Sequence, residues 1–165
     1  MANTNLYNKN VRQRGTHGGI LDSVTGQVRV RASGSEPGPI NVMRLGEGIS
    51  PVRVVCRSYP AGVTGTFALT LVADHTGPFT RPDGKTFPAL AAPFALGSVV
   101  LDANGEAVLA DVNQPTSVFG PTKLVATGAA ANAATVDAVL QFSVEFVPEQ
   151  TVGSPLNLIT DPNVG

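Results

Sequence analysis

Side chains that could do chemistry are few in this 165-residue chain, and they are widely spaced. A Ser-His-Asp site would have to recruit His75, but the adjacent Asp74 points to the opposite face if the strand continues through both residues. The chain has no Gly-x-Ser-x-Gly elbow, since the segment Gly34–Gly38 lacks that spacing. We therefore expect no nucleophilic catalysis.

Metal ligands show no pattern either. A zinc site would have to combine Cys56 with His17 and His75, whose separations match no known ligand spacing. The segment Asp102–Glu106 starts like a calcium loop, but the glutamate needed at the twelfth position would be Asn113, so a plain hairpin turn is favoured. No glycine-rich phosphate motif leads from a strand into a helix. The chain is expected to need no metal and no cofactor and not to be an enzyme.

The amino-acid composition indicates which secondary structure must position any functional group. Only 14% of the residues are charged, against about 25% in a typical soluble domain, and there are 18 Gly and 13 Pro. Val and Thr are abundant while Glu, Lys and Gln are scarce, which favours an all-β domain with many turns. The low charge also suits a surface that is partly covered by other protein.

The single cysteine, Cys56, excludes an internal disulfide and favours assembly in a reducing cytoplasm. The N-terminus lacks the apolar core of a signal peptide. No run approaches the ~20 apolar residues of a membrane span, so we expect no membrane partner.

The net charge of −1 conceals a polarity along the chain. Residues 1–85 carry a net charge of +5, and residues 86–165 carry −6. Two interpretations remain open: basic strands pair with acidic strands inside one sandwich, or a basic face docks on an acidic partner. Nucleic acid is not expected, because the basic strands lack interleaved aromatic side chains for stacking.

Period-two alternation predicts the strands. The clearest is Thr135–Val147, in which Val136, Leu140 and Phe146 share one face with the even-numbered residues between them. A tight turn at Asp102–Gly105 predicts a hairpin within Gly97–Val112. Further strands are predicted at Gln27–Arg31, Ile40–Leu45, Pro51–Tyr59, Thr66–Asp74 and Thr122–Thr127. About eight antiparallel strands with no helical periodicity indicate a β-sandwich, jelly-roll-like, with extended arms at both ends.

The domain boundaries follow from where alternation stops. Residues 1–22 are predicted to form an extended N-terminal arm, residues 23–147 the β-sandwich and residues 148–165 an extended C-terminal tail. The arm has no carboxylate before Asp22 and cannot bury enough apolar surface to order itself, so we expect it to be ordered by a neighbouring subunit.

A long loop, residues 75–96, interrupts the sandwich and contains three phenylalanines, Phe79, Phe87 and Phe94. They are too far from any period to be strand residues. They either cap one end of the sandwich as a satellite core or insert into a partner. The tail adds a short apolar stripe, Leu156, Leu158 and Ile159, which we expect to pack against another subunit or the parent domain.

This organisation resembles that of tailed-bacteriophage capsid decoration proteins, also called cement or head-stabilisation proteins. The resemblance lies in the polar start Met1–Asn5, the cationic segment Lys9–Arg14, the β-domain of low charge, the single cysteine and the apolar tail. It implies a non-enzymatic virion protein that is assembled in the host cytoplasm. Such a protein binds the outside of an icosahedral capsid as a homodimer or homotrimer and clamps adjacent major capsid subunits.

Partner contacts are then expected at the three elements that reach outward. In the arm they are Asn5, Tyr7, Lys9, Arg12 and Arg14. In the loop and tail they are Phe79, Arg81, Phe87, Leu156, Leu158 and Ile159. Two alternatives stay open: another virion subunit, such as a tail-tube or head-fibre protein, or a carbohydrate- or ligand-binding β-sandwich. The absence of tryptophan and the presence of only two tyrosines argue against sugar stacking.

Overall fold

The computed structural model describes residues 11–13, 22–32, 39–115, 117–129 and 133–147, and every regular element in these ranges is a β-strand. The all-β prediction is therefore confirmed, and strands occupy more than half of residues 23–147. The strands are β1 (Val11–Gln13), β2 (Asp22–Val30), β3 (Pro39–Leu45), β4 (Ser50–Tyr59), β5 (Val63–Ala73), β6 (Phe79–Thr80), β7 (Thr86–Phe87), β8 (Phe94–Leu101), β9 (Glu106–Leu109), β10 (Thr122–Gly128), β11 (Ala133–Ala134) and β12 (Ala138–Val147).

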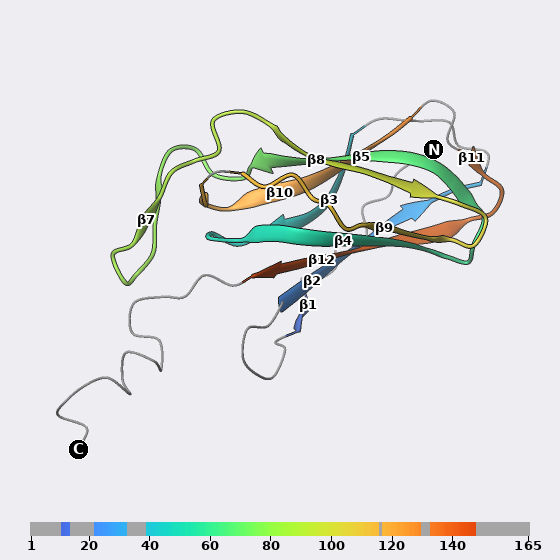
Figure 1. Ribbon diagram of the computed structural model, residues 1–165, viewed down its shortest axis with the longest axis horizontal. Coiled ribbons are helices and arrows are strands. Elements are labelled where there is room, and N and C mark those ends of the chain that lie inside the picture. Colours follow the sequence, from blue (N-terminus) through green and yellow to red (C-terminus); the bar gives the residue numbers. More distant parts are fainter. Residues whose placement is uncertain (1–10, 14–21, 33–38, 116, 130–132, 148–165) are drawn as a thin grey trace, which may run out of the picture.

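The strands form two layers packed face to face (Figure 1). One layer, the β12 sheet, has the order β1-β2-β12-β4-β9. The other, the β5 sheet, has the order β8-β5-β10-β3, with the short β11 also paired to β5. A separate two-stranded unit, β6–β7, lies within the long loop at one end of the sandwich.

The connectivity is that of a jelly roll. The eight longest strands, in chain order, are β2, β3, β4, β5, β8, β9, β10 and β12. Numbered one to eight, they appear in the order 1-8-3-6 in the β12 sheet and 2-7-4-5 in the β5 sheet. All the pairings are antiparallel. Successive strands change layer at every step except from β5 to β8, which pair in the same sheet. This is the interlocked Greek-key pattern that defines the jelly roll.

The core lies between the inner faces of the two sheets. In β12 the side chains from Ala138 to Phe146 alternate as predicted, with Leu140 fully buried and Val139 only half-buried. In β5 the residues Phe67, Leu69 and Leu71 point inward in the same way. The rings of Phe67 and Phe142 meet edge to face across the two layers, with centroids 6.4 Å apart, a favoured geometry for aromatic pairs.

The predicted hairpin at Gly97–Val112 is wrong. The turn itself is present, since the Gly105 N–H donates to the carbonyl of Asp102 and Gly105 has φ +77°. However, β8 pairs with β5, whereas β9 pairs with β4 in the opposite sheet. The turn therefore carries the chain from one layer to the other.

Three other sequence-based boundaries need correction. Val136 is exposed because the long strand begins at Ala138 and not at Thr135. Val11–Gln13, within the predicted arm, form β1 on the edge of the β12 sheet, opposite Ser23–Thr25. The loop phenylalanines are strand residues after all: Phe79, Phe87 and Phe94 lie in β6, β7 and β8.

Candidate functional site

Most residues predicted to bind partners lie outside the described part of the chain. This holds for the arm residues Asn5, Tyr7, Lys9 and Arg14 and for the tail residues Leu156, Leu158 and Ile159. Arg12 lies in β1, where its Cα is paired with that of Val24. The candidates that the structure brings together are therefore Phe79, Arg81 and Phe87, all in the long loop.

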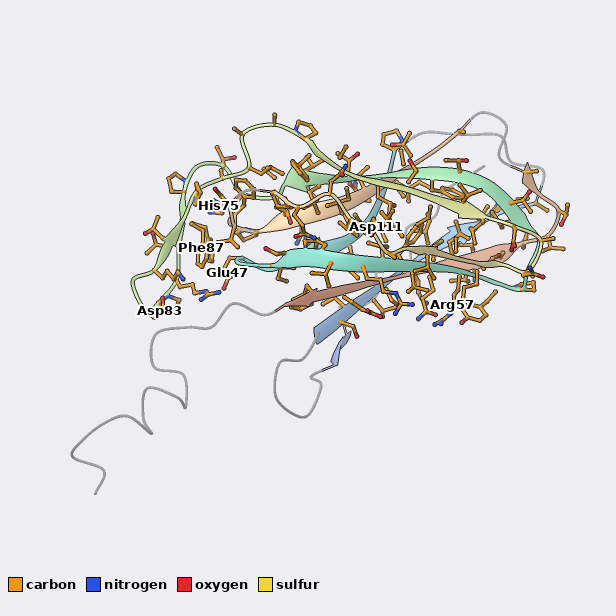
Figure 2. The ribbon with its side chains drawn as sticks, viewed as in Figure 1. Glu47, Arg57, His75, Asp83, Phe87 and Asp111 are labelled. Carbon is orange, nitrogen blue, oxygen red and sulfur yellow. The ribbon has the colours of Figure 1, made fainter. Side chains whose placement is uncertain are left out.

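The long loop projects from one end of the sandwich and is folded on itself (Figure 2). The strands β6 and β7 pair through Phe79 with Phe87 and Thr80 with Thr86. A tight turn joins them: the Arg81 N–H donates to the Lys85 carbonyl, and the Gly84 N–H donates to the Arg81 carbonyl. The Asp83 carboxylate accepts a further bond from the Lys85 N–H. The loop is thus an ordered hairpin with an exposed tip at Pro82–Gly84.

Phe87 is the centre of this hairpin and is only 1% exposed. The Arg81 guanidinium carbon lies 4.7 Å from the Phe87 ring centroid and the Lys85 ammonium nitrogen lies 5.4 Å from it, both within cation–π range. Arg81 Nε also donates to Glu47 Oε1 at 2.8 Å. Because Glu47 follows β3, this ion pair ties the hairpin to the sandwich.

The loop phenylalanines therefore match the satellite-core interpretation. Phe87 is outside the main core but buried, Phe94 is half-buried and packs against the main core, and Phe79 is half-buried. The His75 ring lies edge to face with Phe79, with centroids 5.4 Å apart. Phe87 and Arg81 are engaged inside the chain, and the surface left to a partner is the polar tip.

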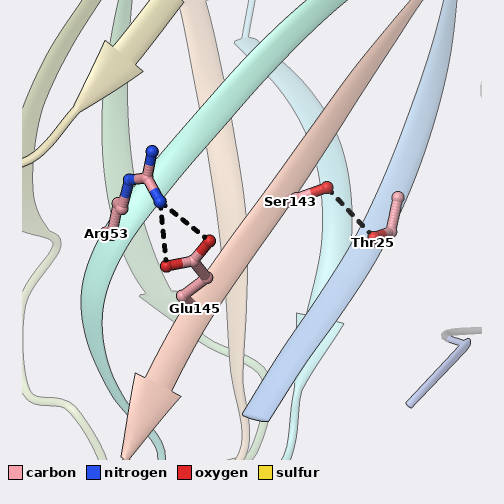
Figure 3. Close-up of polar contacts among 4 residues, drawn as sticks. All are labelled: Thr25, Arg53, Ser143 and Glu145. Carbon is pink, nitrogen blue, oxygen red and sulfur yellow. Dashed lines mark hydrogen bonds and ion pairs between the residues drawn. The ribbon is translucent and has the colours of Figure 1, made fainter. Parts of the chain in front are cut away.

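The basic strands pair with acidic strands inside the sandwich, which is one of the two predicted meanings of the charge polarity. Arg53 Nη1 on β4 lies 3.3 Å from Glu145 Oε1 on β12 (Figure 3). Beside this pair, the hydroxyl groups of Thr25 and Ser143 are 3.1 Å apart. Further along β4, Arg57 Nε donates to Glu106 Oε2 at 2.8 Å, and this bond lowers the pKa of the Glu106 carboxyl and raises that of Arg57.

Asp74 and His75, the residues considered for a catalytic pair, are engaged separately. Asp74 lies 3.0 Å from Arg44 and 3.3 Å from Lys123. His75 Nδ1 lies 3.1 Å from the carbonyl oxygen of Gly77. Cys56 is buried in the main core, and burial raises the pKa of its thiol to about 12. Among the described residues, no three His, Cys, Asp or Glu side chains converge as metal ligands.

The outer faces of the two sheets differ in chemistry. The exposed side of the β12 sheet, here called the β12 face, carries five charged side chains: Arg29, Arg53, Arg57, Glu106 and Glu145. The exposed side of the β5 sheet, here called the β5 face, is lined by small uncharged residues. These are Asn41, Thr66, Ala68, Thr70, Val72, Ser98, Val100, Val125 and Thr127. In the strands of the β5 face, charge occurs only at Arg44 and Lys123, near one end.

The alternation patterns did not single out the exposed apolar side chains. Val100 is 63% exposed on the β5 face, and Tyr59 and Val108 are 51% and 44% exposed on the β12 face. The absence of charged residues from Thr64–Ala73 and Phe94–Leu101 was the signal available in the sequence. Within the described ranges, no helix is long and apolar enough to cross a membrane.

Comparison with known proteins gives a distant likeness to a solved structure. No protein-family model and no curated protein sequence matches this chain. Among solved structures, it is similar to a chain of the structure titled "Acidic stable capsid structure of Helicobacter pylori bacteriophage KHP30". The sequences are 19% identical, the TM-score is 0.37, and the similarity covers 77% of this chain and 89% of the other.

Proposed function

We propose that this chain is a structural protein of a virus particle, and specifically one that binds the outside of an icosahedral capsid and clamps adjacent major capsid subunits. The observation that carries the proposal is the jelly-roll order of the eight strands. Jelly rolls recur in viral capsid domains and lectins. Because one fold serves several functions, the proposal also depends on the surface of this particular domain.

Two features of the surface favour a protein partner. The chain has 14% charged residues, and an entire outer sheet face is uncharged except near its ends. The N-terminal segment contributes Lys9, Arg12 and Arg14 without a carboxylate before Asp22. Guanidinium groups form bidentate contacts with carboxylates at interfaces, so an acidic coat-protein surface is the proposed target of the arm.

The proposed mechanism is preferential binding to the assembled shell. A protein that binds the shell but not the dissociated subunits stabilises the shell by RT ln(1 + [L]/Kd). Linking two copies in a homodimer, or three in a homotrimer, would add avidity on a symmetric lattice of identical sites. No catalytic step is required of the chain.

Cosedimentation with capsids tests the proposal. Purified protein is mixed with mature shells assembled from the coat protein encoded nearest to its gene, and separately with unassembled coat protein. We expect saturable pelleting with the shells at a simple ratio of copies to coat subunits, and no complex with the free subunits. A protein that stays in the supernatant at saturating concentrations would contradict the proposal. Labelling that is confined to tails or fibres would instead favour the other virion parts.

A lectin-like function is the second candidate, and one observation favours it. Tyr59 is 51% exposed on the β12 face, with Arg57 two residues before it and Glu106 bound to Arg57. An exposed ring beside a charged pair is a combination that can stack on a sugar and bind its hydroxyl groups. Titration with glycans that is abolished by Tyr59→Ala would support this function, and shell binding that survives Tyr59→Ala would separate it from capsid binding.

A further inference from the structure

The β5 face is unusual for a sheet surface that faces solvent. Its middle rows consist of Ser98, Ala68 and Thr127 side by side, followed by Thr70 and Val125. Val100, next to Thr66, is the most exposed large apolar side chain among the described residues. The β12 face of the same sandwich carries five charged side chains. The difference indicates that the β5 face is covered by protein, since bare sheet surfaces normally carry charges.

Opposite charges flank this uncharged face. At one end, Asp74 is held between Arg44 and Lys123, so the cluster has a net charge of +1. At the other end, β8 runs into Asp102, whose carboxylate accepts hydrogen bonds from the main-chain and side-chain nitrogens of Asn104. The face is therefore positive at one end and negative at the other, and small and uncharged between.

We propose that the β5 face binds the β5 face of a second copy of this chain. The two-fold axis lies in the interface, perpendicular to the strands, so that the positive end of each copy opposes the negative end of its partner. Each strand then lies over its own symmetry mate, which leaves Asp102, directly after β8, two strands away from the partner's Lys123 of β10. An axis parallel to the strands would bring like charges together. Small side chains on both faces allow the two flat sheets to pack closely, as the two layers within a sandwich do.

The area of the β5 face limits the affinity with which two copies can bind each other. Four strands at about 4.8 Å spacing and nine residues at about 3.3 Å rise give roughly 570 Å² per copy, or roughly 1,100 Å² in total. That total lies at the lower limit for a specific interface. A dimer with a dissociation constant in the micromolar range, on the order of 1–100 µM, is therefore expected.

Sedimentation velocity of the full chain over about 2–300 µM tests the interface. The variants Ala68→Arg and Val100→Arg each place a charge on the β5 face at an exposed position. The matched control, Val108→Arg, makes the same change at an exposed valine of the β12 face. Both β5-face variants should weaken self-association at least about 30-fold, while the control leaves it within about twofold. The melting temperature of each variant shows whether it is folded.

A charge exchange tests the orientation. Lys123→Glu alone and Asp102→Lys alone should each weaken the dimer, because the two ends that oppose each other then carry the same sign of net charge, and the double variant should restore it. A wild-type chain that remains a 16.9 kDa monomer at about 300 µM, the highest concentration used in sedimentation, would overturn the proposal. So would a dimer that Val108→Arg disrupts and Ala68→Arg does not, or a double variant weaker than both single ones. The proposal would also be overturned if the wild-type chain is a monomer and Ala68→Arg abolishes its binding to shells, because the β5 face would then bind coat protein and not a second copy.

This inference can be tested separately from the proposed capsid function. A dimer that does not bind shells would leave the interface standing and the capsid function refuted. If the protein is monomeric and pellets with shells equally well with and without Ala68→Arg, the capsid function would stand and the proposed dimer interface would be refuted.

Discussion

Gly26 of β2 lies directly against the main chain of Val42 of β3, and the contact joins the two layers of the sandwich. A Cβ atom on Gly26 would stand 2.5 Å from the Val42 carbonyl oxygen and 2.9 Å from the Met43 Cβ. Val42 is also the residue that the register between β3 and β10 skips, so the strand is irregular at this point. Glycine is therefore required here for close approach of two backbones.

Gly26→Ala should accordingly destabilise the domain. The added methyl group meets backbone and a Cβ atom, neither of which can rotate away, so the strands must separate locally. A cost of about 1–3 kcal/mol is expected for such overpacking, or a melting temperature about 3–10 °C lower. The matched control is Gly46→Ala, whose new Cβ would meet only the Ile49 Cδ1 atom at 3.8 Å. Equal melting temperatures for the two variants would contradict the close contact.

The ion pair between Glu47 and Arg81 should hold the long loop against the sandwich. Both side chains are largely shielded from water, at 26% and 15% exposure. Glu47→Gln should cost about 1–2 kcal/mol and accelerate tryptic cleavage after Lys85, because the β6–β7 hairpin loses its anchor. Glu106→Gln removes a carboxylate of similar geometry from the exposed pair with Arg57. It should leave both the melt and the cleavage rate unchanged, and an equal effect of the two variants would argue against an anchoring role for Glu47.

Cys56 should make the domain less stable in alkali. Burial raises the pKa of the folded thiol to about 12 from 9.0, so the folded state keeps its proton while the unfolded thiol ionises. The stabilisation is complete below pH 9.0 and is lost as the pH rises from there toward 12. Relative to Cys56→Ala, the wild type should lose about 1 kcal/mol between pH 8 and pH 10 in urea unfolding. Parallel pH profiles for the two proteins would contradict this, as would rapid labelling of the folded thiol.

Binding of the N-terminal arm to the shell remains a prediction, and a deletion of the arm tests it. Because Val11–Gln13 form β1 on the β12 sheet, the deletion should cover residues 2–10 and spare the strand. We expect shell binding about 10–100-fold weaker, because the deletion removes the predicted contacts Asn5, Tyr7 and Lys9 and leaves only Arg12 and Arg14. We expect an unchanged melt, because the sequence of residues 2–10 is too polar to form part of a core. Binding of the full chain should weaken as salt rises, because Lys9, Arg12 and Arg14 are screened. Undiminished binding by the truncated chain would shift attention to the tip at Pro82–Gly84.

Local patterns in the sequence predicted the strands better than their pairing. Alternation identified the inward face of Ala138–Val147 because the buried side chains there are all apolar, whereas Gln141, Ser143 and Glu145 on the opposite face are polar. The Asp102–Gly105 turn was equally recognisable, yet a turn of this chemistry does not specify whether its flanking strands pair or separate into opposite sheets. That choice depends on β4 and β5, which lie far from the turn in sequence.

The surfaces were harder to predict for a similar reason. Val55 points to the outer side of the β12 sheet, opposite Ser143 and Val108 of the neighbouring strands, and is nevertheless only 6% exposed. Phe87 is buried by Arg81 and Lys85, two residues that sequence reasoning would place in water. The sequence shows that β5 and β8 each lack charge, but only their pairing with each other and with β10 joins them into one uncharged face.

Heat disruption of mature shells, followed by release of their contents as protein is titrated in, tests the capsid function most directly. If the chain clamps adjacent coat subunits, bound protein stabilises the shell by RT ln(1 + [L]/Kd), with the Kd found by cosedimentation. The disruption temperature should therefore rise with the free protein concentration in step with this free energy. The deletion of residues 2–10 should shift that curve to higher concentrations without changing its form. A disruption temperature that stays constant while the shells become saturated would show that the chain binds shells and dissociated subunits equally well and would contradict the proposed function.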